Sequence, residues 1–276
     1  MNFDKLNTKL DTTLLGGIGN KKNEYKKYLK DIILNNISKD DIFVEPFCGT
    51  AIISYNLYNT NNIKCHINDI DHFRIDFYNK CKDVNYIKEV NDTIQNINNK
   101  DDYYKIIDRK NLTNNKCNYN TYIYSKLISA FRPGLFDENR KKKIINDNWA
   151  IFLNDNIITN DNFKNIMELY KDNEKAFIYL DPPYLNSYNA SYISYQNDYS
   201  DDNTKIDNTK IYIDILYYLK NSKCKILMSI NNNAIITHIY TDFIKNNYHH
   251  NYGYCHTKED GIKKSNNENI LIISNF

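Results

Sequence analysis

The amino-acid sequence predicts an α/β protein built on an open, mainly parallel sheet, with helices on both faces and an antiparallel hairpin at its C-terminal edge. Three observations support this prediction. Short apolar runs rich in β-branched residues recur along the 276-residue chain, apolar patterns with helical spacing separate them, and each run ends at small or polar residues. Such alternation is typical of a sheet whose strands are buried on both faces.

Four of the apolar runs are predicted parallel strands. The first two, Ile42–Phe47 and Lys64–Asn68, flank a helical pattern at Ala51–Tyr58. Strand, helix and strand in this order form a right-handed βαβ unit. The later runs, Ala176–Leu180 and Lys225–Ile230, extend the same sheet.

The remaining elements complete the predicted layers. Apolar residues recur at helical spacing in Asp207–Lys220 and in Ala234–Phe243. Near the C-terminus, Asn269–Ile273 is a further strand, with His249–Cys255 as its antiparallel partner. An antiparallel edge on a parallel sheet is common in such folds.

The chain divides into three predicted regions. Residues 1–84 form the first part of the sheet, and residues 149–276 form the rest. Between them, residues 85–148 are helical in pattern, rich in Asn and charge, and without a convincing strand, so we expect an inserted domain. Residues 185–210, dense in Asn, Asp, Ser and Tyr, are too long for an ordinary connection and are expected to form a mobile lid.

Composition excludes several classes of protein. A net charge of +2 permits contact with a phosphate backbone but requires that any basic surface be local. The six cysteines form no C-x-x-C pair, so we expect neither a metal site nor a secreted disulfide framework. Without an apolar signal core or a run of about 18 apolar residues, the chain is expected to be cytoplasmic and not membrane-bound.

The first motif joins a buried strand to a helix through small residues, at Glu45–Ala51 (EPFCGTA). Such a turn lets a ligand approach the backbone at the carboxyl end of a strand. A tight turn with nothing bound explains the same residues equally well. At the end of the next strand, Asp69 is placed to accept the hydroxyls of a ribose, whereas Asp71 is expected to cap the following helix.

The second motif is a hydrophobic strand that stops at Asp181-Pro182-Pro183-Tyr184. Two prolines fix φ twice and remove two donors, so the loop presents carbonyl oxygens, a carboxylate and an aromatic ring rigidly. The Asp181 carboxylate and the Pro182 carbonyl are suited to accept hydrogen bonds from an adenine amine, while Tyr184 is suited to stack on a base turned out of a duplex. We therefore interpret this loop as the catalytic segment of methyl transfer to a base amine.

These motifs, in this order, resemble the Dam family of adenine-N6 DNA methyltransferases, which includes phage and restriction-modification members. The resemblance is strongest at Glu45–Gly49 and Asp181–Tyr184 and spans most of the chain. It implies a Rossmann-like sheet that binds S-adenosylmethionine (SAM), and it makes Asp181, Pro182, Pro183 and Tyr184 the catalytic residues.

The resemblance also implies a cofactor site. Gly19–Lys21 (GNK) is similar to the N-terminal segment whose lysine lies at the SAM site in this family, and Asn162-Phe163 stands where members usually have Asp-Phe around the SAM adenine. The implied SAM-binding residues are Lys21, Phe47, Gly49, Asp69, Phe163 and Asp181.

In this family, the segment between the SAM motifs and the catalytic loop recognises the DNA target, which implies that role for residues 85–148. Phe131–Phe136 and the basic run after it resemble the recognition segment, and the implied DNA contacts are Arg132, Asn139, Arg140 and Lys141. A positive run here is suited to pair with phosphates, although a solvated helix end explains it equally well.

Several residues depart from the family pattern. Ala51 replaces the usual second glycine of the first motif, Gly17 replaces a common tryptophan, and Asn162 replaces an aspartate. The recognition segment also lacks the Phe-Asn-x-Pro stretch of enzymes that methylate GATC, so that target does not carry over.

The resulting hypothesis is a site-specific, SAM-dependent methyltransferase acting on adenine N6 in double-stranded DNA, and a paired restriction endonuclease is kept open as a partner. Two alternatives stay open at this point. The same loop chemistry suits an RNA adenine methyltransferase or, with less support from motif order, transfer to cytosine N4. The departures at Gly17, Ala51 and Asn162 instead motivate a catalytically silent nucleic-acid-binding module that retains the fold.

Overall fold

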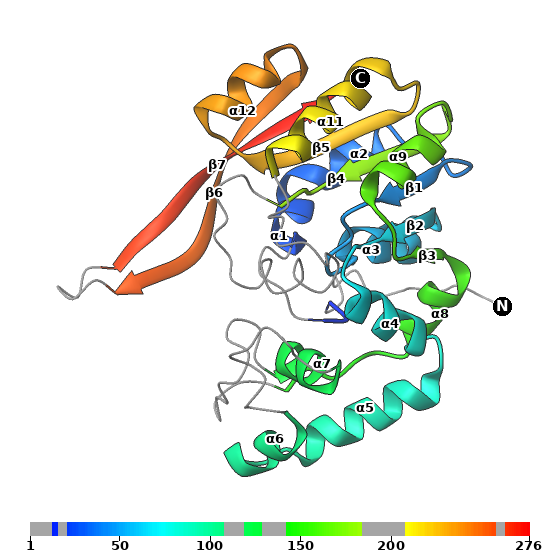
Figure 1. Cartoon of the computed structure of the whole chain (residues 1–276), viewed down its shortest axis with the longest axis vertical. Coiled ribbons are helices and arrows are strands. Elements are labelled where there is room, and N and C mark those ends of the chain that lie inside the picture. The colour runs from blue at the N-terminus through cyan, green and yellow to red at the C-terminus, as the bar shows by residue number, and fades with distance from the viewer. Residues whose placement is uncertain (1–12, 16–20, 108–118, 129–141, 184–207, 258–262) are drawn as a thin grey trace.

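The structure is a computed structural model that describes residues 13–15, 21–107, 119–128, 142–183, 208–257 and 263–276 (Figure 1). One seven-stranded sheet has the order β3-β2-β1-β4-β5-β7-β6. Its strands are β1 (Ile42–Glu45), β2 (Lys64–Asn68), β3 (Ile157–Thr159), β4 (Ala176–Leu180), β5 (Lys225–Asn231), β6 (Ile244–Thr257) and β7 (Lys263–Ser274).

The described helices begin with one continuous segment, in which α1 (Lys22–Glu24) leads through a π-helical turn, η1 (Tyr25–Leu29), into α2 (Lys30–Leu34). The others are α3 (Ile52–Asn61), α4 (His72–Lys80), α5 (Val84–Asn96), α6 (Lys100–Ile106), α7 (Tyr119–Ile128), α8 (Asn148–Asp155), α9 (Phe163–Tyr170), α11 (Asn208–Asn221), α12 (Ala234–Ile239) and a 3₁₀ turn, η2 (Thr241–Phe243).

The order of the parallel strands reverses at β1. This strand pairs in parallel with β2 on one side and with β4 on the other, and β4 pairs in parallel with β5. The chain runs outward from β1 through β2 to β3, and then returns to the opposite side of β1 as β4. Open α/β sheets bind ligands at the carboxyl ends of the strands beside such a reversal. The predicted α/β fold class is confirmed.

The core has two layers, one on each face of the sheet, because alternate residues of a strand point to opposite faces. In β4, Phe177 and Tyr179 belong to the cluster that includes α3 and α8, whereas Ile178 and Leu180 belong to the cluster that includes α9, α11 and α12. Successive side chains of a strand point to opposite faces, so every residue of β4 is buried. This explains why the strand is a continuous apolar run in the sequence.

The C-terminal hairpin is antiparallel, as predicted, and longer than the sequence pattern suggested. β7 pairs antiparallel with β5 on one side and with β6 on the other, from Ile244↔Ile273 to Thr257↔Lys263. Figure 1 shows the two strands reaching well beyond the rest of the sheet. The apolar pattern ends where the strands leave the core, although their pairing continues.

The short edge strand β3 was not predicted. Its three residues follow α8 directly and pair in parallel with β2. Three residues are too few to display a strand periodicity, so only the neighbouring strand reveals the element. Of residues 85–148, the described part contains α5, α6, α7 and the start of α8 and no strand. The division of the chain into three regions stays a prediction.

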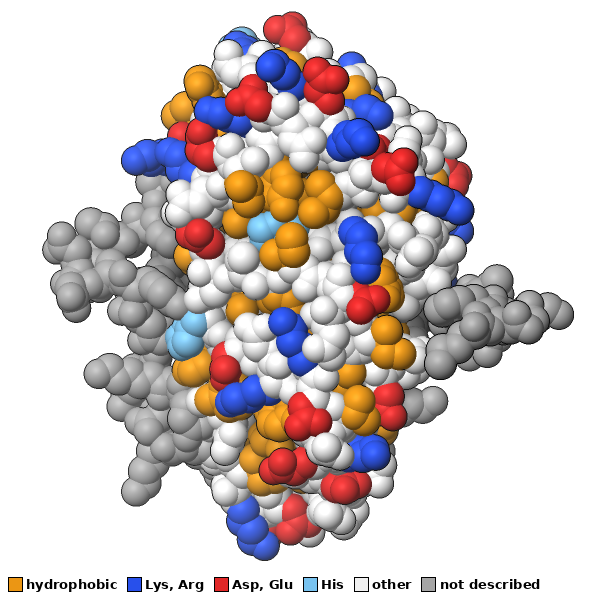
Figure 2. All heavy atoms as spheres, turned by 90° about the vertical axis from the view of Figure 1, so that its right-hand side faces the viewer, with side chains coloured by type: hydrophobic (Ala, Val, Ile, Leu, Met, Phe, Trp, Pro, Cys, Tyr) orange, Lys and Arg blue, Asp and Glu red, His pale blue; other side chains and the backbone are white. Residues whose placement is uncertain are grey.

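The surface on the side that carries α8 and β3 is mixed in charge. Figure 2 shows lysine and arginine side chains interspersed there with aspartate, glutamate and apolar side chains. That face therefore offers no continuous basic surface to a phosphate backbone. None of the helices in the described ranges combines the length and the apolar composition that crossing a membrane requires.

One buried amide ties three strand ends together. The fully buried Asn68, at the end of β2, donates hydrogen bonds from Nδ2 to the carbonyls of Pro46 (3.0 Å) and Asp161 (2.9 Å). Its Oδ1 accepts from the Asp161 N–H (2.9 Å) and the Thr159 hydroxyl (2.8 Å). The amide thus fixes the segments after β1, β2 and β3 relative to one another.

We predict that Asn68→Ala lowers the free energy of unfolding by about 3 kcal/mol or more, because it leaves buried backbone groups without partners, at roughly 1–3 kcal/mol each. Urea denaturation measures the loss. Asn221→Ala is the matched control, since its exposed amide bonds, among the described residues, to the Tyr217 carbonyl of the same helix. The control should change stability by less than about 0.5 kcal/mol. Equal losses of unfolding free energy in the two variants would contradict the structural role given to Asn68.

Candidate functional site

The turn after β1 has a backbone conformation that favours glycine. Gly49 has φ of 50° and Ala51 has φ of 51°, both in the left-handed region. The Cys48 N–H donates to the Asn68 carbonyl (2.8 Å), which holds the turn against the end of β2. Ala51, which replaces the family's usual glycine, therefore occupies a position where the backbone conformation favours glycine.

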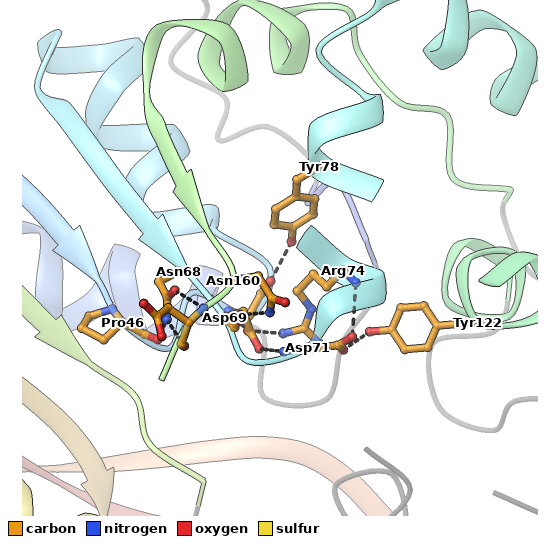
Figure 3. A network of polar contacts seen from close by, with 10 residues as sticks. Pro46, Asn68, Asp69, Asp71, Arg74, Tyr78, Tyr122 and Asn160 are labelled. Atoms are coloured by element: carbon orange, nitrogen blue, oxygen red, sulfur yellow. Dashed lines mark hydrogen bonds and ion pairs between the residues drawn. The ribbon is translucent and has the colours of Figure 1, made fainter. Parts of the chain in front are cut away.

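Helix α4 holds this turn through two side chains. The Tyr78 hydroxyl donates to the Gly49 carbonyl (2.6 Å). The Gly49 N–H donates to Asp69 Oδ2 (2.9 Å), and Arg74 Nη1 lies 2.7 Å from the same oxygen (Figure 3). A Cβ at Gly49 would meet Arg74 only at an ordinary 3.7 Å, so positive φ rather than crowding favours glycine here.

Asp69 and Asp71 take different roles. Asp71 caps α4 by accepting a hydrogen bond from the Arg74 N–H (3.2 Å), as predicted. Asp69 Oδ1 accepts from the Asp71 N–H (3.0 Å), and its Oδ2 accepts from Gly49 and Arg74. Within the described residues Asp69 therefore accepts three bonds, and a carboxylate has about four acceptor sites. The predicted role of Asp69 toward a ribose stays a prediction.

Arg74 is a site residue that the sequence interpretation missed. Its side chain is 16% exposed and forms ion pairs with Asp69 and, at 3.5 Å, with Asp71. Burial acts to lower the pKa of the guanidinium, but the charges of Asp69 and Asp71 outweigh it and hold the pKa above its ordinary value. The available signal was its position three residues after the predicted helix cap.

The residues predicted at the catalytic loop and near the N-terminus come together. Lys21 Nζ lies 3.2 Å from Asp181 Oδ1 and 3.0 Å from Glu24 Oε1. The side chains of Lys21 and Glu24 are 6% and 2% exposed, against 23% for Asp181. Asp181 follows β4 directly, so the ion pair joins the N-terminal helix to the end of a central strand.

Burial alters the protonation of two carboxyl groups at this edge of the sheet. It raises the pKa of Asp181 to about 6; the Lys21 charge acts in the opposite direction, and the Glu24 charge adds to the increase. Burial likewise raises the pKa of Glu45, at the end of β1, to about 8 even though Ser54 donates hydrogen bonds to its carboxylate. The site therefore contains carboxyl groups that change charge between weakly acidic and weakly alkaline pH.

Glu24 is itself held from two central strands. Ser229 of β5 lies with its hydroxyl 3.5 Å from Glu24 Oε2, and the Tyr179 hydroxyl of β4 lies 2.6 Å from the Ser229 hydroxyl. Neither Glu24 nor Ser229 was predicted as a site residue. The i, i+3 spacing of Lys21 and Glu24 at a helix start was a usable signal for the first. Nothing in the sequence pattern points to the second.

Two further predicted cofactor residues form an aromatic pair. The rings of Phe47, after β1, and Phe163, at the start of α9, stack with centroids 5.0 Å apart. Asn162 caps α9 by accepting a hydrogen bond from the Lys164 N–H (3.0 Å). The asparagine that departs from the family pattern therefore has a structural role in presenting Phe163.

The prolines of the predicted catalytic loop lie beside α11, because the Tyr212 hydroxyl donates to the Pro183 carbonyl (2.9 Å). Tyr184 and the predicted DNA contacts Arg132, Asn139, Arg140 and Lys141 lie outside the described residues, as does most of the predicted lid. A search of the described ranges finds no cluster of three or more His, Cys, Asp or Glu residues able to hold a metal ion.

The left-handed backbone at Ala51 gives a prediction about stability. Ala51→Gly should change the free energy of unfolding by less than about 1 kcal/mol, since relief of strain of about 1–2 kcal/mol is offset by greater freedom of the unfolded chain and lost methyl burial. Ala51→Val should lower it by more than about 2 kcal/mol, because a β-branched residue is a severe outlier at positive φ. Thermal and urea unfolding check both. An unchanged free energy of unfolding in Ala51→Val would show that the backbone of residue 51 is not in the left-handed region.

Comparison with known proteins places this site in a family. A search of the curated proteins finds no match to the chain. The family model described as D12 class N6 adenine-specific DNA methyltransferase matches residues 18–253, which include the turn after β1, Asp69 and the loop at Asp181. The resemblance to Dam-like enzymes is confirmed. The chain belongs to the D12 class N6 adenine-specific DNA methyltransferase family, an enzyme family that uses SAM.

Proposed function

We propose that this protein transfers a methyl group from SAM directly to the N6 amine of an adenine in double-stranded DNA, at a specific sequence and with the base turned out of the duplex. The observation that carries the proposal is the pairing of Asp181 with the buried Lys21 at the end of β4, directly before two prolines. It gives a carboxylate a fixed position in a rigid loop at the carboxyl edge of the sheet.

The proposed roles follow from the chemistry of an exocyclic amine. The Asp181 carboxylate and the Pro182 carbonyl accept hydrogen bonds from the two amine protons, which draws the nitrogen lone pair out of conjugation with the ring. Lys21 holds the carboxylate through its 3.2 Å contact. Tyr184 stacks on the adenine. When bound, SAM supplies an electrophilic methyl group on a sulfonium.

The cofactor residues proposed from the sequence fit a nucleoside with a cationic centre. Gly49 and Asp69 lie together at the carboxyl ends of β1 and β2, and the stacked pair of Phe47 and Phe163 presents aromatic surface to an adenine. Asp181 and Lys21 lie at the end of the neighbouring β4, where the reacting methyl group has to meet the base. These six residues are our proposed SAM site.

The recognition of DNA is proposed for residues 85–148, with Arg132, Asn139, Arg140 and Lys141 as contacts to the duplex. A DNA substrate also makes the cytoplasm the expected place of action, and a paired endonuclease stays a separate proposal. Competition between DNA and RNA of matched sequence distinguishes the substrates: methylation of the RNA alone would overturn the choice of DNA.

Asp181→Asn tests the catalytic assignment. The neutral amide should lower methyl transfer at least about 100-fold, because it loses the charge that strengthens the hydrogen bonds from the amine. SAM binding should persist through the other five proposed cofactor residues. The assay incubates protein with labelled SAM and mixed-sequence DNA and digests the product to nucleosides, where N6-methyladenosine is expected. Asp172→Asn is the matched control, since this exposed carboxylate pairs only loosely with Lys223 at 3.8 Å.

Two outcomes would contradict the proposal. Activity of Asp181→Asn within tenfold of the wild type would remove Asp181 from the catalytic role, and methylcytosine as the sole product would remove adenine as the target. Calorimetry without SAM binding but with intact DNA binding would favour the silent module instead.

The pH dependence of kcat/KM tests the Lys21–Asp181 pair. Asp181 has a raised pKa of about 6, so activity should fall as the pH drops through about 6 and the carboxylate becomes protonated. Lys21 lowers that pKa, so Lys21→Met should move the acid limb to higher pH. Lys64→Met is the control, because Lys64 is 59% exposed and pairs with Asp155. An acid limb unmoved by Lys21→Met would show that another group controls it.

A further inference from the structure

One buried ammonium group is shared by two carboxylates at the end of β4. Lys21 Nζ donates to both oxygens of the Glu24 carboxylate, at 3.0 and 3.2 Å, and lies 3.2 Å from Asp181 Oδ1. Lys21 and Glu24 are buried, so solvent ions screen their charges only weakly. When all three groups are ionised, two carboxylates and one ammonium carry one net negative charge.

Two central strands fix the position of Glu24. The Ser229 hydroxyl of β5 donates a long hydrogen bond (3.5 Å) to Glu24 Oε2, and the Tyr179 hydroxyl of β4 lies 2.6 Å from the Ser229 oxygen. A serine hydroxyl has one proton, so Tyr179 is the donor to Ser229 when Ser229 donates to Glu24. Because both hydroxyl-bearing residues are buried in the sheet, the carboxylate of Glu24 is held beside Lys21.

Glu24 opposes the effect of Lys21 on Asp181. Burial raises the pKa of Asp181, the Lys21 charge lowers it, and the Glu24 charge raises it. Lys21 and Asp181 alone would form a neutral pair. The Glu24 charge offsets the ammonium, so the carboxylate at the end of β4 still attracts a second cation.

Two neighbouring titratable groups add little charge near neutral pH. Burial raises the pKa of Glu45, in β1, to about 8, and the Asp181 charge adds to the increase. Burial also raises the pKa of Tyr179 well above its ordinary value. Both side chains are therefore mainly protonated and neutral at neutral pH. Among the described residues, the charges that act on Asp181 come from Lys21 and Glu24.

The substrate and product forms of the cofactor differ in charge at sulfur. SAM has a positive sulfonium, and transfer of its methyl group to the amine leaves the neutral thioether of S-adenosylhomocysteine. In the proposed function, the methyl group reaches a base held at the loop after β4, so the sulfur lies toward Asp181. A net negative charge at this position attracts the sulfonium and gives no such attraction to the thioether.

We propose that Glu24 determines the preference of the site for SAM over its product: it offsets the Lys21 charge and so leaves the carboxyl edge of β4 negative toward the sulfonium. Glu24 acts through Lys21 and Asp181 and needs no contact of its own with the cofactor. This inference rests on the proposed function, because it places SAM beside Asp181.

Calorimetry without DNA tests the proposal by measuring the Kd of SAM and the Kd of S-adenosylhomocysteine for the wild type and for Glu24→Gln near neutral pH. Glutamine keeps the shape of the side chain and an oxygen that accepts from Lys21, but it removes the charge. The Kd of SAM should rise at least about fivefold, whereas the Kd of S-adenosylhomocysteine should change less than about twofold. Thermal unfolding checks that the variant is folded.

Glu168→Gln is the matched control. Glu168 also pairs with a lysine three residues away, Lys171 at 2.5 Å, and it also accepts a hydrogen bond linked to a hydroxyl, from Tyr218 at 2.9 Å. Its side chain is half exposed, so water screens its charge. Both Kd values should stay within about twofold of the wild type.

The pH dependence of kcat/KM is a second readout, one that a purely structural role of Glu24 would not move. Glu24 raises the pKa of Asp181, so Glu24→Gln should lower that pKa and keep the carboxylate charged at lower pH. The acid limb should therefore move to lower pH, in the opposite direction from Lys21→Met. In the wild type, the preference for SAM should fall as the pH drops through about 6, because protonation of Asp181 removes the net charge.

The outcomes separate the two proposals. A wild type that binds neither compound would overturn the proposed function. Two Kd values that rise by the same factor in Glu24→Gln, or that both stay unchanged, would overturn the inference alone, as would an acid limb that stays in place or moves to higher pH. If Glu24→Gln does not fold, the wild type decides: a ratio of the two Kd values that is the same at about pH 7 and about pH 5 would overturn the inference.

Discussion

The ion pair between Lys21 and Asp181 is the interaction on which the candidate site depends. Burial disfavours a charged carboxylate at the end of β4, yet the role proposed for Asp181, to accept hydrogen bonds from an amine, requires that charge. A lysine supplied by a distant part of the chain keeps the carboxylate charged near neutral pH. Glu24 orients the lysine, and Ser229 of β5 and Tyr179 of β4 orient Glu24. The position of the Asp181 carboxylate therefore depends on contacts with the N-terminal helix and with two strands.

The same arrangement recurs one strand away. Asp69 follows β2 and pairs with Arg74. Helix α4 provides both Arg74 and Tyr78, whose hydroxyl donates to the Gly49 carbonyl. Asp181 and Asp69 thus each have a cationic partner, Lys21 or Arg74, from a segment outside the sheet. The reversal of strand order at β1 brings both pairs to one edge, because parallel strands end on the same side.

The sequence predicted the elements whose signal lies in neighbouring residues of the chain. The apolar runs predicted β1, β2, β4 and β5 because such strands bury both faces, and the loop at Asp181 was visible because prolines restrict the backbone. The proximity of Lys21 to Asp181 came from family resemblance rather than from pattern. Arg74, Glu24 and Ser229 were missed, because their importance arises from partners that only the tertiary fold supplies.

The π-helical turn at Tyr25–Leu29 has a consequence for how this family member is compared with others. A π turn accommodates about one residue more than an α turn, so it rotates the helix before the turn relative to the helix after it by roughly 100°. Lys21 and Glu24 precede the turn, and the buried Ile33 lies beyond it. The present directions of Lys21 and Ile33 relative to each other depend on that extra residue, so a relative without it would direct its lysine elsewhere.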